Sequence, residues 1–91
     1  MTEVEVRVQL FAKAKELAGG ASCVTCRLAA GDTTITSEDF LNKYLFEAVP
    51  ALRALAGSAI LAVEDAYVEP QEVLTLSAKS DIALIPPISG G

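Results

Sequence analysis

The last two residues, Gly90 and Gly91, are the part of the chain whose residue types and position offer chemistry. Neither carries a Cβ, so this end can enter a channel little wider than a backbone and present an unhindered α-carboxyl group. The pattern therefore predicts that the Gly91 carboxylate is the reactive group. The plain alternative is that both glycines are fraying residues of an ordinary chain end.

Cys23 and Cys26 form a C-x-x-C, a spacing also found in metal knuckles and redox pairs. Both lie in an alternating run, however, and residues three apart on a strand point to opposite faces. The chain has no histidine and no third cysteine, so a zinc shell would need carboxylates, which is unusual for a structural site. We therefore expect no metal site and two reduced thiols, with Cys26 inward and Cys23 outward.

The remaining sequence shows no catalytic apparatus of its own. It has no histidine, no G-x-S-x-G and no phosphate-binding glycine loop. Chemistry at Gly91 would then depend on other proteins. The sequence favours a carrier over a self-sufficient enzyme.

Composition limits the partners. With 91 residues, 52% hydrophobic and 21% charged, the chain is typical of one folded domain. The net charge is −5 and the seven basic residues are scattered, so we expect no nucleic acid partner. The first residues are too acidic for a signal peptide and no apolar run approaches a membrane span. We therefore expect a cytosolic protein without a membrane partner.

The elements that position the tail begin with a strand over residues 3–11. Valines and Leu10 alternate with polar residues along it, which is typical of a half-buried strand. Phe11 falls on the polar face, where the pattern predicts a solvated residue. A short helix over 12–18 ends at Gly19 and Gly20. Residues 22–28 then form a second strand, antiparallel to the first.

The main helix follows a turn at 29–32, and Thr34, Thr36 or Ser37 can cap it. Its apolar stripe contains Phe40 and Leu45. Phe46 lies off the stripe, and we expect the following segment to cover it. Pro50 ends this helix and can start a second one over 51–56, which Gly57 closes.

Residues 59–63 are apolar on both faces, which suits an interior strand. Shorter strands at 67–68 and 73–76 precede the last strand, 81–85, which Pro86 and Pro87 end because proline cannot continue a ladder. This order of elements is that of an α+β protein with the β-grasp, or ubiquitin-like, fold: a mixed sheet packed on one main helix. We expect one domain, 1–91, with a flexible tail, 86–91. The predicted core comprises Val6, Val8, Phe40, Leu41, Leu45, Leu61, Ile82 and Leu84.

Two stretches resemble one known family. The run from Asp81 to Gly91, a strand followed by Pro-Pro, a branched residue, Ser and Gly-Gly, resembles the end of the molybdopterin synthase small subunits, the MoaD-like sulfur carriers. The run from Leu10 to Gly19 resembles the family's first strand end and short helix. One departure is Ser80-Asp81, where the family usually has Gly-Asp, so we expect a turn that tolerates a non-glycine residue.

The resemblance implies that the first and last strands are parallel neighbours at the centre of the sheet. Phe11 and Ile85 would then lie side by side, and Tyr67 could join them. In the family, the matching positions contact the large synthase subunit and the activating enzyme. The alternative is that these are single exposed apolar residues, which are normal on protein surfaces and indicate no function. We favour a docking patch because these residues would cluster beside the tail.

The resemblance also implies the chemistry. An ATP-dependent enzyme of the ubiquitin-activating type would adenylate the Gly91 carboxylate, and a persulfide-derived sulfur would replace AMP to leave a thiocarboxylate. No cofactor would be bound stably. Gly90 would give clearance, Pro86 and Pro87 would direct the tail, and Ile88 and Ser89 would thread the entrance of the partner's tunnel.

The implied assembly is a heterotetramer of two small and two large subunits. The large subunit would hold cyclic pyranopterin monophosphate, and two successive tails would supply the two dithiolene sulfurs of molybdopterin. Two alternatives stay open: a sulfur carrier for thiamine biosynthesis or tRNA thiolation, and a ubiquitin-like modifier whose Gly91 forms isopeptide bonds.

Overall fold

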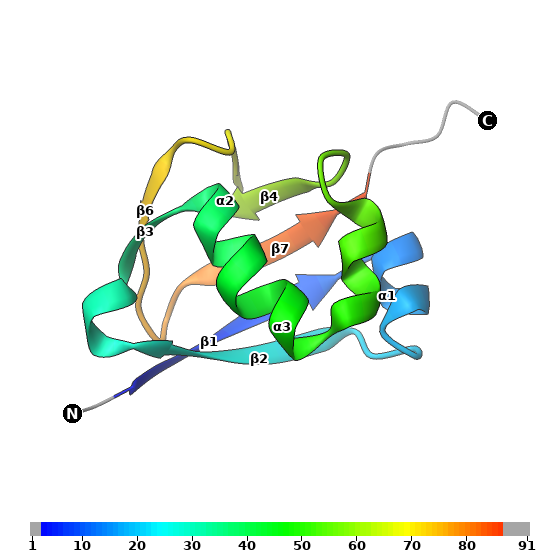
Figure 1. Ribbon diagram of the computed structural model, residues 1–91, viewed down its shortest axis with the longest axis horizontal. Coiled ribbons are helices and arrows are strands. Elements are labelled where there is room, and N and C mark those ends of the chain that lie inside the picture. Colours follow the sequence, from blue (N-terminus) through cyan, green and yellow to red (C-terminus); the bar gives the residue numbers. More distant parts are fainter. Residues whose placement is uncertain (1–2, 87–91) are drawn as a thin grey trace.

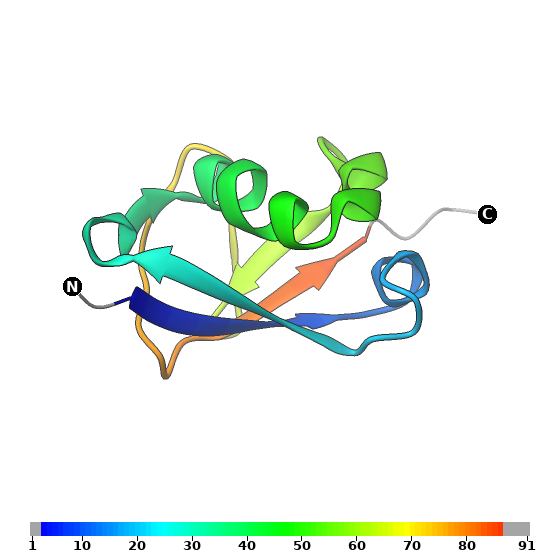
Figure 2. The same ribbon diagram turned by 60° about the horizontal axis from the view of Figure 1, so that its bottom comes forward.

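The computed structural model describes residues 3–86, so the sequence predictions for Pro87, Ile88, Ser89, Gly90 and Gly91 lie outside the described residues. Its main feature is a five-stranded sheet in the order β2-β1-β7-β4-β5, with the main helix, residues 37–48, packed over one face (Figures 1 and 2). The strands are β1 (Glu3–Leu10), β2 (Cys23–Ala29), β4 (Ile60–Val63), β5 (Ala66–Val68) and β7 (Asp81–Ile85). A separate two-stranded sheet joins β3 (Thr34–Thr36) to β6 (Val73–Thr75).

The centre of the large sheet is a parallel pair. β1 and β7 align with Val8 opposite Ile82 and Leu10 opposite Leu84. β2 runs antiparallel to β1, as expected for a strand that returns after a short helix. The β-grasp prediction, including the parallel pairing of first and last strands, is therefore confirmed.

The main helix is continuous but not uniform. It comprises α2 (Ser37–Phe40), η2 (Leu41–Leu45), which is a π-helical turn, and α3 (Phe46–Ala48). A π-turn advances each residue by a smaller angle than an α-helix, so side chains after it lie on a different face than a 3.6-residue period predicts. Phe46, which lies off the predicted stripe, is buried, and the guanidinium of Arg53 in the following segment lies 5.8 Å from its ring centroid. The expectation that this segment covers Phe46 is therefore confirmed.

Leu41 departs from the predicted core in the opposite sense. It is only half-buried and packs at the margin of the core, whereas the other seven predicted core residues are buried. Leu41 lies at the first position of the π-turn, where a 3.6-residue period no longer describes the faces of the helix. Phe40 and Leu45, five residues apart, are both fully buried.

The helices begin and end close to the residues predicted from the sequence. The Asp39 N–H donates to the Thr36 side chain at 3.2 Å, so Thr36 is the cap among the three candidates. The second helical segment, η3 (Pro50–Leu55), is a 3₁₀ helix that buries Leu52 and Leu55. The short helix α1 (Lys13–Leu17) is followed by Gly19 at φ 75°, and another short 3₁₀ turn, η1 (Ala30–Asp32), precedes β3.

The turn before β7 needs no glycine. The Ser77 N–H donates to the Ser80 hydroxyl at 2.8 Å, and the Ser80 N–H donates to the Ser77 carbonyl at 3.0 Å. Ser80 does not adopt a positive φ. The expected tolerance of a non-glycine residue at position 80 is thereby explained by serine side-chain bonds. Within residues 3–86, no helix is long and apolar enough to cross a membrane.

Candidate functional site: an apolar patch at the end of the last strand

The candidate site lies on the sheet face that the helices leave uncovered. Across this face Gln9 is opposite Ala83, Ala83 is opposite Ala62, and Ala62 is opposite Tyr67. The next row contains Ile85 opposite Ile60, and Phe11 follows Leu10, the partner of Leu84. We call Phe11, Ile60, Tyr67 and Ile85 the tail-end patch.

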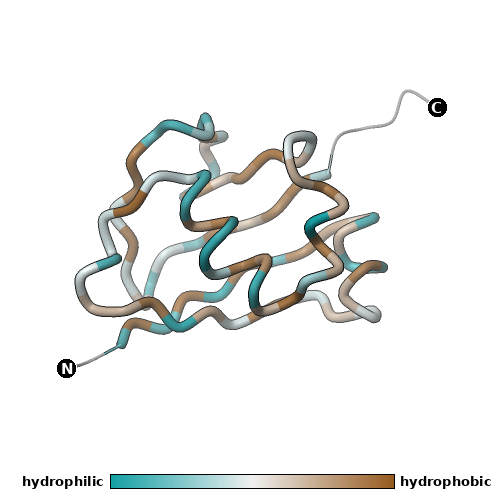
Figure 3. The backbone as a smooth tube through the Cα atoms, in the orientation of Figure 1, coloured by the Kyte–Doolittle hydropathy of each residue, from teal (hydrophilic) through white to brown (hydrophobic). Residues whose placement is uncertain are grey.

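The tail-end patch is well exposed. Phe11 is 47% exposed, Ile60 41% and Tyr67 70%, while Ile85 is half-buried between its neighbours. The β4 strand is hydrophobic throughout, so it contributes to the core on one face and to this patch on the other (Figure 3). Large apolar side chains gathered on one exposed face are typical of an interaction surface.

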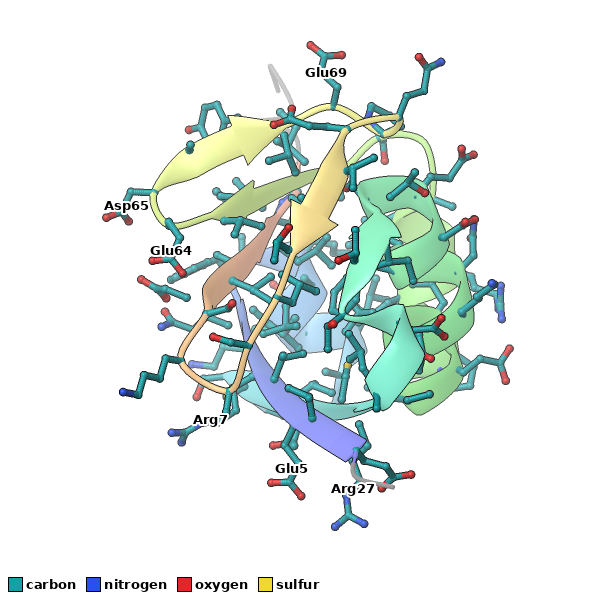
Figure 4. The ribbon with its side chains drawn as sticks, turned by 90° about the vertical axis from the view of Figure 1, so that its left-hand side faces the viewer. Glu5, Arg7, Arg27, Glu64, Asp65 and Glu69 are labelled. Carbon is teal, nitrogen blue, oxygen red and sulfur yellow. The ribbon has the colours of Figure 1, made fainter. Side chains whose placement is uncertain are left out.

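The other half of the same sheet face is charged. Arg27 pairs with Glu5 at 3.1 Å, Arg7 is opposite Asp81, and the Asp81 N–H donates to the Glu64 carboxylate at 2.8 Å. Figure 4 shows Glu5, Arg7, Arg27 and Glu64 pointing outward. Side-chain character therefore changes along the strands, from charged at the start of β7 to apolar at its end.

Local geometry holds Phe11 at this end. β1 stops at Leu10, whose N–H donates to the Ser22 carbonyl at 2.9 Å, and Ala12 adopts a φ of 52°. A positive φ at alanine turns the chain sharply off the sheet. The Ala14 N–H then donates to the Phe11 carbonyl at 3.1 Å and starts α1. Backbone hydrogen bonds on both sides therefore hold Phe11 in a defined turn between β1 and α1.

The chain leaves the sheet beside this patch. Ile85 is the last residue of β7, and Pro86 directly after it is buried. The first residue assigned to the tail from sequence therefore lies in the folded body. The predicted patch residues Phe11, Tyr67 and Ile85 share one sheet face, which the parity of the strands and the implied strand order foretold. Ile60 was not predicted from the sequence. Neighbouring residues on a strand point to opposite faces, so the inward position predicted for Leu61 could have shown that Ile60 points outward.

The two cysteines differ as predicted. Cys23 is exposed, whereas Cys26 is 2% exposed and faces the core. Burial raises the pKa of the Cys26 thiol to about 11, and the neighbouring Cys23 adds to this rise. In the part of the chain that the structure describes, no three His, Cys, Asp or Glu side chains are grouped to hold a metal ion.

These features define a ubiquitin-like protein of the β-grasp class with an apolar patch where its last strand ends. The chain is 35% identical to the molybdopterin synthase sulfur carrier subunit of Chlamydomonas reinhardtii, over 97% of this chain and 100% of the relative. It is 33% identical to the subunit of the same name in Arabidopsis thaliana, over 99% of this chain and 86% of the relative. The chain therefore belongs to the molybdopterin synthase sulfur carrier subunit family.

Solved structures agree on the fold. The crystal structure of small archaeal modifier protein 1 from Haloferax volcanii matches with a TM-score of 0.71 and 27% identity, covering 96% of this chain and 99% of that one. A putative molybdopterin converting factor subunit 1 from Pyrococcus furiosus matches with a TM-score of 0.69 and 22% identity, covering 93% and 99%, which supports the fold alone. No protein-family model matches the chain.

Proposed function

We propose that this protein carries sulfur on its C-terminal glycine within molybdopterin synthase. An ATP-dependent enzyme of the ubiquitin-activating type would adenylate the Gly91 carboxylate and release pyrophosphate. The terminal sulfur of a persulfide then attacks the carbonyl carbon and AMP leaves. Reduction of the resulting acyl disulfide by a thiol leaves the Gly91 thiocarboxylate. Adenylation is needed because a carboxylate oxygen is otherwise a poor leaving group.

The observation that carries this proposal is the tail-end patch beside the end of β7. A carrier without catalytic groups must dock on each enzyme that handles its tail, and docking needs exposed apolar area near the tail. Phe11, Tyr67 and Ile85 lie at that position. Membership in the sulfur carrier family supports sulfur transfer as the purpose of such docking.

The partners follow from the same proposal. The large synthase subunit supplies the active site and holds cyclic pyranopterin monophosphate, and the small subunit binds no cofactor of its own. Two thiocarboxylate tails in succession donate the two dithiolene sulfurs, in a heterotetramer of two small and two large subunits. Pro86 and Pro87 direct the tail, Ile88 and Ser89 thread the tunnel, and Gly90 fits its narrowest part.

The experiment that tests the proposal combines loading and transfer. The full chain is incubated with its cognate activating enzyme, ATP and a sulfur donor, and intact mass is measured. We expect the mass increase of one oxygen replaced by sulfur at Gly91. The loaded chain is then mixed with the large subunit and pterin precursor, and we expect molybdopterin. Loading without molybdopterin formation would favour a carrier of thiamine or tRNA thiolation chemistry instead.

A second candidate function is protein modification through Gly91. The similarity to small archaeal modifier protein 1 of Haloferax volcanii favours it, because that protein's name describes a modifier. The same loading mixture, supplied with cell proteins, distinguishes the two. Isopeptide conjugates of this chain to lysines would support the modifier, whereas a free thiocarboxylate as the sole product supports the carrier.

A further inference from the structure

We propose that a groove between the main helix and β5 receives a basic, apolar segment of the large synthase subunit. The inference rests on the proposed function, because it takes the large subunit as the partner. The groove encloses about 620 Å³ between α2 and η2 on one side and β5 with residues 69–70 on the other. Its apolar lining includes Leu41, Phe46, Ala59, Leu61 and Val68.

The walls of the groove are held together by backbone hydrogen bonds. The Ser37 N–H donates to the Glu72 carbonyl and the Glu38 N–H donates to the Pro70 carbonyl, both at 2.9 Å. These bonds fix the turn after β5 to the start of the helix. Leu41 and Val68 are half-buried, so a partner side chain placed against them would remove further apolar surface from water. The groove is therefore a preformed surface with apolar area still to cover.

The charge of the rim indicates which segment fits. Glu38 lines the helix side and Glu69 the strand side, and both are exposed. Neither makes an ion pair within residues 3–86, and the residues that line the groove include no lysine or arginine. Two carboxylates on opposite sides of one groove favour a partner lysine or arginine and disfavour the chain's own terminal carboxylate.

The groove is continuous with the tail-end patch. Ile60 and Tyr67 belong to that patch and also line the groove. β5 is the edge strand of the sheet, so no further strand of the described sheet lies between the tail-end patch and the groove. A partner docked on the patch can therefore extend one segment around β5 into the groove. The charged rim would add orientation to an otherwise apolar contact.

Charge reversal at the rim tests the inference. Calorimetry would measure the affinity of the full chain for its cognate large subunit at several salt concentrations. We expect Glu38→Lys and Glu69→Lys each to weaken binding about tenfold, with a smaller dependence on salt. Glu3→Lys makes the same change in net charge at the start of β1, away from the groove, and should bind like the wild type. Glu38→Gln serves as a milder variant if lysine disturbs the first helical turn.

The outcomes of these measurements distinguish failure of the groove inference from failure of the proposed function. If the wild type binds and both rim variants keep its affinity and salt dependence, the groove inference is wrong while the proposed function stands. If the wild type does not bind the large subunit, the proposed function fails and the groove inference fails with it. Amide NMR of the free protein tests the other occupants. Shifts at Glu38 and Val68 that change on removal of residues 87–91, or with protein concentration, would assign the groove to the tail or to a second copy and overturn the inference.

Discussion

Ile60 and Ile85 lie directly opposite each other in the antiparallel pair of β4 and β7, at the end of the sheet where residue 86 leaves it. Leu61 and Leu84, the adjacent pair, point into the core and are 2% and 0% exposed. The same two strands therefore hold the domain together on one face and form the tail-end patch on the other. Substitutions on the two faces should separate stability from partner binding.

Phe11 tests the outer face. We expect Phe11→Arg to weaken binding of the large subunit by about 2 kcal/mol or more, because an aromatic side chain that a partner buries is a typical anchor. The free energy of unfolding should fall by no more than about 1 kcal/mol, since Phe11 is already 47% exposed. Val73→Arg is the matched control, because Val73 is 59% exposed but lies on β6 in the small sheet. Equal losses of stability and binding in Phe11→Arg would mean that Phe11 is core.

Leu45, on the main helix that packs against the inner face of the sheet, tests the core. It is fully buried in the π-turn, so Leu45→Ala should lower the free energy of unfolding by about 2–5 kcal/mol through lost burial and a cavity. Leu41→Ala should cost clearly less, because Leu41 is half-buried at the margin of the same turn. Denaturant midpoints of the two variants provide the comparison. A larger effect at Leu41 would contradict the placement of the π-turn.

The tail tests the carrier mechanism. Deletion of Gly91, addition of one residue after it, or Gly90→Val should each abolish molybdopterin formation in the reconstituted assay. One residue displaces the reacting atom by about 3.3–3.6 Å, which exceeds the tolerance of a reactive geometry. Thermal unfolding should stay unchanged, because the identified core lies between Val6 and Leu84. Appreciable activity without Gly91 would exclude the proposed mechanism.

The buried Cys26 thiol should make the free energy of unfolding depend on pH. Because the pKa of Cys26 is raised to about 11 from an ordinary 9.0, the folded state keeps this proton over a range in which the unfolded chain loses it. The free energy of unfolding should therefore decrease as pH rises from 9.0 towards 11, and Cys26→Ala should lack that component. At pH 8, alkylation followed by mass spectrometry should modify Cys23 quickly and Cys26 only upon unfolding. Rapid modification of both would contradict the burial of Cys26.

Much of the fold could be predicted because its strands alternate and its turns carry glycine, proline or serine. The π-turn could not, since no residue type marks it, and the wrong burial predicted for Leu41 followed from assuming an α-helical period. β3 was also missed, because three residues give too short an alternation and Thr36 was recognised only as a cap. At the site, parity placed Phe11 and Ile85 on the less apolar faces of their strands, and the family resemblance implied that they are neighbours. The pairing of Ile60 with Ile85 depends on strand order, which the residues alone do not encode.

The central position of β7 also governs when the domain can fold. Both neighbours of this strand, β1 and β4, precede it in the sequence, and β1 is separated from it by most of the chain. During synthesis, the large sheet therefore has an open gap until residue 85 has been made. Such long-range pairing slows folding relative to local helical contacts. A chain interrupted before β7 would lack the strand that closes its sheet, so the tail-end patch forms only when the domain is complete.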